Sequence, residues 1–370
     1  MAGSRALARG RKYGCDAAGV PFILIYLKMH LPDDNELPVH LLAGCFNNTS
    51  ATYKFYWFLS VLQAVEKGRA PIAKTDLFAD MVSHAWYTVN YFKVSFGVQD
   101  KLQQAISRIR VNEGLTIDAG RAAIFDHLSN TRNISTIREL RYFNGEVPHR
   151  FLSPWLRAAD KLQAYEASRR YENDCPYALF DDHIEINPIW KDYLVRNAGI
   201  LRGFCYWHLS LYLQSKNPNV PDIPNKLIKS PVRKTLTEQR KFWDIVLNEL
   251  GSVDCIYTNR KLIVGDYAVE HFLPYAFVSH DLMWNLIPAD RSFNSSKSDK
   301  LPPLERYFDP YFKLQSEAVL IIQDKAPKNK FLEDYLTIVP DIASFERQRV
   351  FEQISPIATI ALNNGFELLR

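Results

Sequence analysis

Apolar residues recur at helical spacing through most of the N-terminal part of the chain. The clearest case runs from Ala51 to Val65, where apolar side chains lie nearly all round the predicted helix. Thr49 and Ser50 before it are suitable N-terminal caps, and Gly68 after it is a typical stop. We predict a buried helix and expect its aromatic residues to pack in a core; stacking on nucleic-acid bases is the alternative.

Similar spacing predicts helices in five further stretches. They are residues 75–91, 99–111, 119–128, 155–170 and at least one helix within 189–213. The first 150 residues should therefore be predominantly α-helical. The pattern then breaks at Asn217–Asn225, which contains three prolines and three asparagines and should form an extended or turning connector. We place a domain boundary at this connector.

A different pattern follows the connector. Thr235 and Glu238 have the spacing of a capping box and should begin a helix that ends at Gly251. Three short runs rich in β-prone residues come next, at 254–257, 261–264 and 267–271. We therefore expect a small β-containing unit after the helical region.

Turn residues suggest how this unit is arranged. Gly265-Asp266 is a tight hairpin signal between the last two β-prone runs, so His271 would lie at the end of the second hairpin strand. Asn294 and Lys297 are three residues apart and would share one face of a short helical turn. This geometry can bring Glu270, His271 and Asn294 together.

Composition sets broad limits on the class of protein. A chain of 370 residues usually forms two or three structural units, and 47% hydrophobic with 23% charged residues is typical of a globular protein. The net charge of +4 is too small to indicate a polyanionic partner by itself. The longest apolar run near the N-terminus, Val20–Leu27, is too short to span a membrane.

The five cysteines are widely separated and include no Cys-x-x-Cys pair. Neither a disulfide framework nor a zinc knuckle is indicated, so we expect reduced thiols and a cytoplasmic location.

Positive charge is concentrated between residues 226 and 241. Six basic residues and one acidic residue give this stretch a local net charge of +5. Such a block could hold nucleic-acid phosphates, and the alternative is a solvated linker face. The basic residues are Lys226, Lys229, Arg233, Lys234, Arg240 and Lys241.

One segment carries the residue types of a reaction centre. Glu270 directly precedes His271, and Asn285 and Asn294 follow that histidine at offsets of 14 and 23. The carboxylate is a hard oxygen donor for a divalent metal, and the imidazole can take a proton from water. This combination suits phosphodiester hydrolysis.

These residues resemble the HNH nucleases, whose ββα-metal fold is a hairpin and a helix around one divalent ion. The similarity is closest to the HNH domain of RNA-guided CRISPR effectors and spans Asp254 to Pro303. The residues that carry it are Cys255-Ile256-Tyr257-Thr258, Glu270-His271-Phe272-Leu273-Pro274, Asn285, Asn294, and Lys297-Ser298-Asp299 before Leu301-Pro302. Several positions at consistent separations are more specific than a bare Glu-His pair.

The resemblance implies a role for each residue. His271 would be the general base, with one ring nitrogen held by a carbonyl, and Asn285 would belong to the catalytic set by ordering the loop. Glu270 and Asn294 would bind Mg²⁺ or Mn²⁺, which prefer oxygen ligands. The expected contacts to substrate phosphates are Lys297, Arg291, Lys229, Arg233 and Lys234.

Two positions depart from the family pattern. Glu270 stands where Asp is more common, so the metal would lie farther from the strand. Cys255 has no second cysteine to complete a structural zinc site, so no zinc knuckle is expected and packing against flanking helices must brace the hairpin.

Other candidate residues favour structural interpretations. The carboxylates of Asp181–Glu185 should face solvent near a strand and turn, and His208 should be a core histidine. His280 and Asp281 could support the site or bind a metal, although ordering a loop is the preferred interpretation. No phosphate-binding glycine loop and no serine-nucleophile elbow is present in the sequence.

The predicted architecture is α+β. We expect a mainly helical targeting or interaction region at 1–225, an HNH ββα-metal nuclease domain at 226–310, and a helical C-terminal extension at 311–370. The expected function is a metal-dependent DNA endonuclease or nickase, with RNA as a possible substrate, acting in bacterial defence against phage or plasmids. A protein partner or self-association through the helical region is also expected. The alternative is a catalytically silent HNH-fold subunit that binds nucleic acid or serves as a scaffold.

Overall fold

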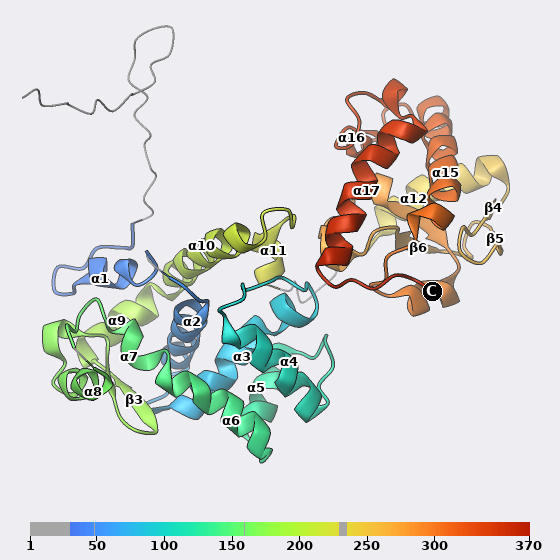
Figure 1. Ribbon diagram of the computed structural model, residues 1–370. Coiled ribbons are helices and arrows are strands. Elements are labelled where there is room, and N and C mark those ends of the chain that lie inside the picture. The colour runs from blue at the N-terminus through green and yellow to red at the C-terminus, as the bar shows by residue number, and fades with distance from the viewer. Residues whose placement is uncertain (1–29, 48, 159, 229–234) are drawn as a thin grey trace, which may run out of the picture.

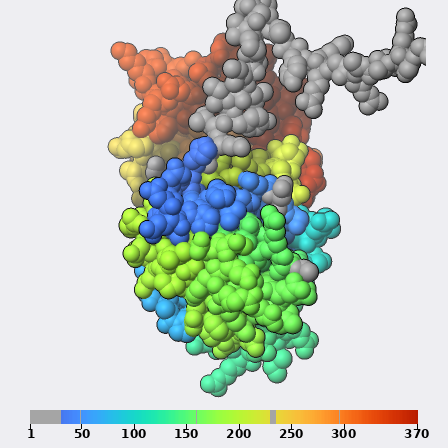
Figure 2. All heavy atoms as spheres, turned by 90° about the vertical axis from the view of Figure 1, so that its left-hand side faces the viewer, coloured from blue at the N-terminus to red at the C-terminus, as the bar shows by residue number. Residues whose placement is uncertain are grey.

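The computed structural model describes residues 30–47, 49–158, 160–228 and 235–370. These residues form two lobes (Figure 1). We call the described residues up to 228 the helical lobe, and residues 235–370 the C-terminal lobe. On the face shown in Figure 2, most of the surface belongs to the helical lobe, with the orange and red C-terminal lobe along the upper edge.

The helical lobe contains eleven α-helices among its described residues. They are α1 (Val39–Gly44), α2 (Tyr53–Glu66), α3 (Lys74–Asn90), α4 (Lys101–Glu113), α5 (Arg121–Ser129), α6 (Ile134–Tyr142), α7 (Pro148–Phe151), α8 (Lys161–Arg169), α9 (Pro188–Arg196), α10 (Ala198–Lys216) and α11 (Ile223–Leu227).

Helices α2 and α3 pack against each other at the centre of this lobe. Because apolar residues surround α2, its middle is buried on all sides, with Trp57 and Leu62 fully inaccessible. Trp57 also donates a hydrogen bond to the Tyr177 hydroxyl at 2.9 Å. The aromatic residues of α2 are therefore core residues, which confirms the packing interpretation.

Most predicted helices of this lobe are confirmed within a few residues. The exception is 155–170, where helix α8 begins only at Lys161. The Asp160 side chain accepts a hydrogen bond from the Gln163 backbone and caps the helix there. Trp155 precedes this helix and is buried against Trp190 of α9. Trp155 is apolar because it packs in this tertiary contact, and it is not part of the helical periodicity of α8.

A small antiparallel sheet lies within the helical lobe. Its strand order is β1 (Ile72–Ala73), β3 (His183–Ile186), β2 (Tyr177–Leu179). The predicted strand and turn around Asp181–Glu185 is confirmed, since residues 180–182 connect β2 to β3.

The proline-rich connector is only partly irregular. Residues 217–222 turn, but α11 follows at once and packs on α3 and α10. Pro224 lies in the first turn of α11, where its missing backbone donor has no cost. The prediction of a fully non-helical connector is therefore wrong for its last part, and α11 belongs to the helical lobe.

The C-terminal lobe combines two short ribbons with six α-helices among its described residues. The strands are β4 (Val253–Asp254), β5 (Lys261–Leu262), β6 (Ala268–His271) and β7 (Leu286–Ala289), and the helices are α12 (Thr237–Leu250), α13 (Tyr275–Val278), α14 (Arg291–Lys297), α15 (Leu304–Lys325), α16 (Leu332–Tyr335) and α17 (Arg347–Asn363).

The predicted capping box at the start of α12 does not form. The N-cap residue is Leu236, without a side-chain cap, and Glu238 pairs with Lys241 at 2.6 Å. The helix still ends at Gly251, whose φ of 74° suits a residue without a side chain. The capping prediction is wrong because α12 begins at Thr237, which puts the N-cap position on Leu236 and not on Thr235.

Strand pairing also differs from the predicted hairpin. β5 pairs with β4, and β6 pairs with β7 in antiparallel register, with Glu270 opposite Ile287 and His271 opposite Leu286. Gly265-Asp266 does form a turn, but that turn joins the two ribbons. All four residues of β7 are buried, whereas Lys261 of β5 is exposed, so β6 buries more apolar surface beside β7.

The helices after the ribbons complete the core of the C-terminal lobe. α15 packs against α12, β7 and α17. Residues 365–369 then return to the ribbon region, where the Leu301 backbone donates to the Glu367 carbonyl at 2.8 Å and accepts from Leu369 at 2.7 Å. These two hydrogen bonds hold residues 367–369 against Leu301, which follows the end of α14 by a few residues.

Within the described residues, no helix combines the length and the apolar character needed to cross a bilayer.

Candidate active site

The two strands β6 and β7 and the following helix α14 form a ββα arrangement at one side of the C-terminal lobe. The side chain of Asp290 accepts a hydrogen bond from the Ser292 backbone at 2.9 Å and starts α14 directly after β7. This cap fixes where α14 begins, and α14 contacts β6. Glu270 and His271 at the end of β6 therefore face a cleft that Asn294 of α14 also lines.

The cleft has a volume of about 710 Å³ and lies between the two lobes. Its lining residues are Tyr91, Phe92, Asp118, Asn225, Ile228, Leu236, Val269, Glu270, His271, Tyr275, Ala276, Ser279, Asp281, Asn294, Ser298 and Asp299. The three side chains that the sequence places in one reaction centre thus share one concave surface, which is the usual form of a binding site.

Glu270 is held by a lysine. The Lys297 ammonium donates to Glu270 Oε1 and to the His271 carbonyl, both at 2.8 Å. Lys297 is fully buried and Glu270 is only 7% exposed. Burial lowers the pKa of Lys297 below its usual value, and the Glu270 carboxylate opposes that shift.

His271 is oriented by an acidic partner. Its Nε2 lies 2.9 Å from Asp281 Oδ1, and its ring packs edge-on against Tyr275 at 5.4 Å between centroids. A carbonyl was expected at one ring nitrogen, and the partner that His271 has at Nε2 is a carboxylate. His280 lies beside this pair, and burial together with the nearby His271 lowers the pKa of His280 to about 4, which keeps it neutral.

Asn285 orders the loop between β6 and β7. Its side chain is fully buried, accepts a hydrogen bond from the Leu273 backbone at 2.8 Å and donates one to the Leu273 carbonyl at 2.9 Å. This side chain binds the two ends of a long connection together. It supports the shape of the site and offers no atom to the cleft.

The expected phosphate contacts have other partners or fall outside the described residues. Lys297 has no exposed surface and is bound to Glu270. Arg291 is exposed, but its guanidinium donates to the carbonyls of Gly265 and Tyr267 and so holds the turn between the ribbons. The other three residues, Lys229, Arg233 and Lys234, lie outside the described part of the chain.

The donor set can accommodate a hard divalent ion. Glu270 supplies a carboxylate, Asn294 a carboxamide oxygen, and the open cleft leaves room for water and a phosphate oxygen. Across the described residues, this site included, no three His, Cys, Asp or Glu side chains are grouped so as to hold a metal, so protein ligation here would depend on Glu270 and Asn294. Cys255 is buried, and its sulfur accepts from the Asp290 backbone at 3.4 Å. That thiol therefore helps to pack the ribbon against α14.

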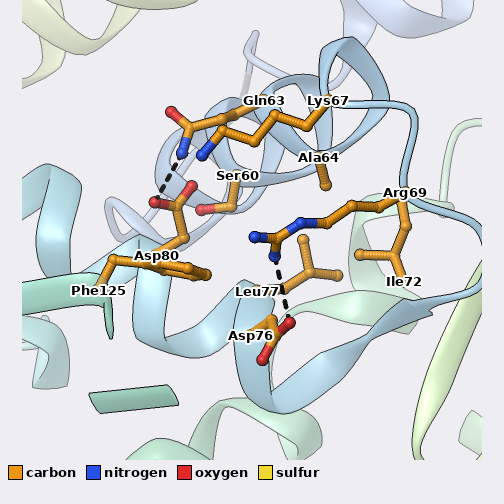
Figure 3. Close-up of a pocket in the computed structure, with 10 residues that line it drawn as sticks. All are labelled: Ser60, Gln63, Ala64, Lys67, Arg69, Ile72, Asp76, Leu77, Asp80 and Phe125. Atoms are coloured by element: carbon orange, nitrogen blue, oxygen red, sulfur yellow. Dashed lines mark hydrogen bonds and ion pairs between the residues drawn. The ribbon is translucent and has the colours of Figure 1, made fainter. Parts of the chain in front are cut away.

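A second, much smaller cavity lies in the helical lobe (Figure 3). Its volume of about 10 Å³ has room for roughly one water molecule. Asp80 accepts from Gln63 at 3.2 Å there, and Arg69 pairs with Asp76 at 3.2 Å, so these polar groups satisfy one another. The cavity is a structural feature and does not add a reaction centre.

The paired strands β6 and β7 and the following helix α14 form a ββα arrangement that carries Glu270, His271 and Asn294. Residues 255–303 match the family model described as HNH endonuclease, and this segment belongs to the HNH superfamily. No curated protein and no solved structure matches the chain. The matched segment contains β5, β6, β7 and α14, so the similarity covers the site and does not extend to the helical lobe.

Two features of the site were not predicted from the sequence. The pairing of His271 with Asp281 depends on how a ten-residue loop folds back, although the notable His280-Asp281 pair was a signal. The second wall of the cleft comes from Tyr91, Asp118 and Asn225 of the helical lobe. No local pattern in the sequence marks those residues.

Proposed function

We propose that this protein is a metal-dependent HNH endonuclease or nickase that hydrolyses phosphodiester bonds in DNA. The observation that carries the proposal is that Glu270, His271 and Asn294 line one cleft inside the segment that matches the HNH model. A ribonuclease activity is a variant of the same chemistry.

His271 is the proposed general base. Asp281 engages Nε2, which leaves Nδ1 to take a proton from the water that attacks the phosphorus atom. The carboxylate also stabilises the imidazolium that this transfer creates. Asp281 therefore acts as a positioning residue.

Glu270 and Asn294 are the proposed ligands of Mg²⁺ or Mn²⁺. When bound, such an ion supplies Lewis-acid stabilisation of the phosphate oxygens. The Lys297 ammonium occupies only Oε1 of Glu270, so the second carboxylate oxygen can face the cleft.

The proposal is tested with a supercoiled plasmid incubated with protein and Mg²⁺ or Mn²⁺. His271→Ala should reduce metal-dependent nicking by about two to four orders of magnitude, because a general base contributes that much. Asp281→Asn should lower kcat and leave KM nearly unchanged, and Asp281→Glu should recover part of the rate. Asp324→Asn is the control, since that side chain is 75% exposed on α15. Labelled RNA and single-stranded DNA in the same assay identify the substrate.

The alternative function is a catalytically silent subunit that keeps the HNH fold. The Lys297–Glu270 ion pair favours it, because a buried ammonium already neutralises the proposed metal ligand. Binding of nucleic acid without metal-dependent nicking in any of these assays would support this alternative.

We further propose that the helical lobe selects the target or docks a partner, and that the enzyme acts in the bacterial cytoplasm against phage or plasmids. The four described cysteines are buried and unpaired, which fits a reducing compartment. The defence role rests on analogy with RNA-guided effectors.

We propose that self-association takes place through one face of α10. Ile200, Trp207 and Leu211 are each at least half exposed and follow one another along the helix, with Gly203 between them. A side chain added at Gly203 would meet nothing within 4 Å, so a second copy of α10 can approach closely there. A dimer would supply the second centre needed to cut both strands.

A further inference from the structure

The wall of the cleft opposite the candidate catalytic residues belongs to the helical lobe. Tyr91 and Phe92 after α3, Asp118 before α5, and Asn225 of α11 line this wall. The HNH segment alone therefore forms only half of the cleft in which Glu270 and His271 lie.

The space within the cleft is small for a nucleic-acid duplex. Its 710 Å³ is in the range of roughly 300–1,000 Å³ that holds a compact small molecule, which is enough for a nucleotide-sized group. The major groove of B-DNA alone is about 12 Å wide. A duplex that presented a phosphate to His271 would require the lobes to separate.

The described lining of the cleft also has few groups that attract nucleic acid. Four carboxylates, Asp118, Glu270, Asp281 and Asp299, are among its lining residues, and within the described residues no lysine or arginine lines it. Nucleic-acid affinity depends chiefly on cations placed near backbone phosphates. Glu270 and Asp299 are paired with Lys297 and Lys93, so what the described lining withholds from a polyanion is a cation that could meet a phosphate.

Lys93 of the helical lobe bridges to the C-terminal lobe at the rim of this cleft. Its ammonium lies 3.3 Å from Asp299 Oδ2, donates to the Gly365 carbonyl at 3.1 Å, and lies 4.4 Å from the centre of the Phe366 ring. Lys93 has a φ of 53°, a left-handed conformation that is uncommon for a residue with a side chain. The three contacts hold one side chain in a strained backbone position, as occurs at switch regions.

A second lysine joins the lobes deeper in the molecule. The Lys226 ammonium donates to the Ser279 hydroxyl and to the Pro221 carbonyl, both at 2.6 Å. Lys226 is fully buried. Lys93 and Lys226 of the helical lobe thus each contact residues of the C-terminal lobe that flank or line the cleft.

We propose that this arrangement is an autoinhibited state, in which the helical lobe shields the HNH site from duplex nucleic acid and Lys93 ties the lobes together. The inference rests on the proposed function for its biological meaning, but the closure itself can be measured separately. Opening exposes the site, and it also frees the Lys93 ammonium to contact a phosphate.

The test substitutes Lys93 by asparagine, which removes the ammonium and tolerates the left-handed backbone. Lys191→Asn is the matched control, because Lys191 is exposed on α9 and its loss changes the net charge equally. Losing a cation should by itself weaken nucleic-acid binding. We expect the opposite for Lys93→Asn, a labelled DNA duplex bound about threefold to tenfold more tightly, since a partly exposed tie is of modest strength.

The separation of the lobes is measured with spin labels at Val111→Cys and Leu320→Cys in a Cys15→Ser background. These two sites are 74% and 66% exposed, one in each lobe, and the described native cysteines are buried. Lys93→Asn should lengthen the distance between the labels, as should addition of the DNA duplex to the protein with Lys93 intact.

If the distances between the spin labels do not change in Lys93→Asn, Lys93 does not hold the lobes together. If the distances lengthen but the DNA duplex binds no more tightly, the helical lobe does not shield the site. Should no variant nick any nucleic acid while Lys93→Asn still opens and binds more tightly, the catalytic function fails and the closure stands.

Discussion

The Glu270 carboxylate has to satisfy a buried ammonium and, in the proposed function, a divalent ion. Lys297 is completely inaccessible, so its charge depends on Glu270 and on the His271 carbonyl. Removing one partner of a buried ion pair leaves the other charge uncompensated, whereas removing both partners can be nearly neutral.

We therefore predict that Lys297→Met destabilises the C-terminal lobe by about 3 kcal/mol without metal. The double variant Glu270→Gln/Lys297→Met should lose much less, because no unpaired charge remains. Mg²⁺ should also raise the unfolding temperature of Lys297→Met more than that of the unsubstituted protein. Urea unfolding with and without Mg²⁺ measures both effects. Equal losses in the single and double variants would contradict this account.

At the same scale, the sequence indicated which residue types carry the chemistry but not all of their contacts. Glu270, His271 and Asn294 could be selected because their spacing resembles a family pattern. Lys297 was expected to contact phosphate and is instead bound to Glu270. A lysine on a short helix has no local signal for burial, because burial depends on how α14 lies against β6.

Helices and strands agree with the sequence-based prediction where the apolar periodicity is strong. They differ from it where a strand has two possible pairing partners. The bounds of α2 and α3 are predicted closely because most of their residues are apolar and are removed from water only when the whole helix lies in the core. The hairpin at Gly265 is wrong because a turn signal says that the chain bends and not which strand it joins. The pairing of β6 with β7 is decided by buried surface across a long loop.

The exposed face of α10 gives a prediction at this scale. If two copies pair through it, Trp207→Glu should convert a dimer to a monomer, because it places a charge at the centre of an apolar contact. Leu320→Glu on α15 is the control, since that residue is 66% exposed on the other lobe. Sedimentation velocity measures the change. A protein that is monomeric before substitution would refute self-association through α10.

For the whole molecule, the two lobes share the cleft, and the helical lobe buries two lysines, Lys74 in α3 and Lys226 in α11. Burial lowers the pKa of Lys74 and of Lys226 to about 8. The folded state therefore releases protons from these groups near pH 8, whereas the unfolded chain keeps them until about pH 10.5. Because the unfolded state binds more protons in this window, the contribution of both lysines to stability rises with pH between about 8 and 10.5.

We predict that this rise disappears in the double variant Lys74→Met/Lys226→Met. The quantity to compare is the midpoint of urea unfolding of each protein from pH 7 to pH 10, since the difference between the proteins cancels the titration of tyrosines and cysteines. Below about pH 8 the difference should be constant. A difference that does not change with pH would show that these ammonium groups titrate normally.

At this scale the sequence indicated several structural units but not that the site lies between them. Tyr91, Asp118 and Asn225 come from separate parts of the helical lobe, and only the complete fold brings them opposite His271. Contacts between distant segments carry no periodicity, so they could not be read from local patterns.

The contacts of Lys93 with Gly365 and Phe366 also bear on biosynthesis. A ribosome produces the chain from its N-terminus, and domains generally fold in that order. The helical lobe, the strands β6 and β7 and helix α14 are therefore made before residues 365–366 emerge, so two of the three Lys93 contacts at the rim of the cleft form only after the residues that line it have been synthesised.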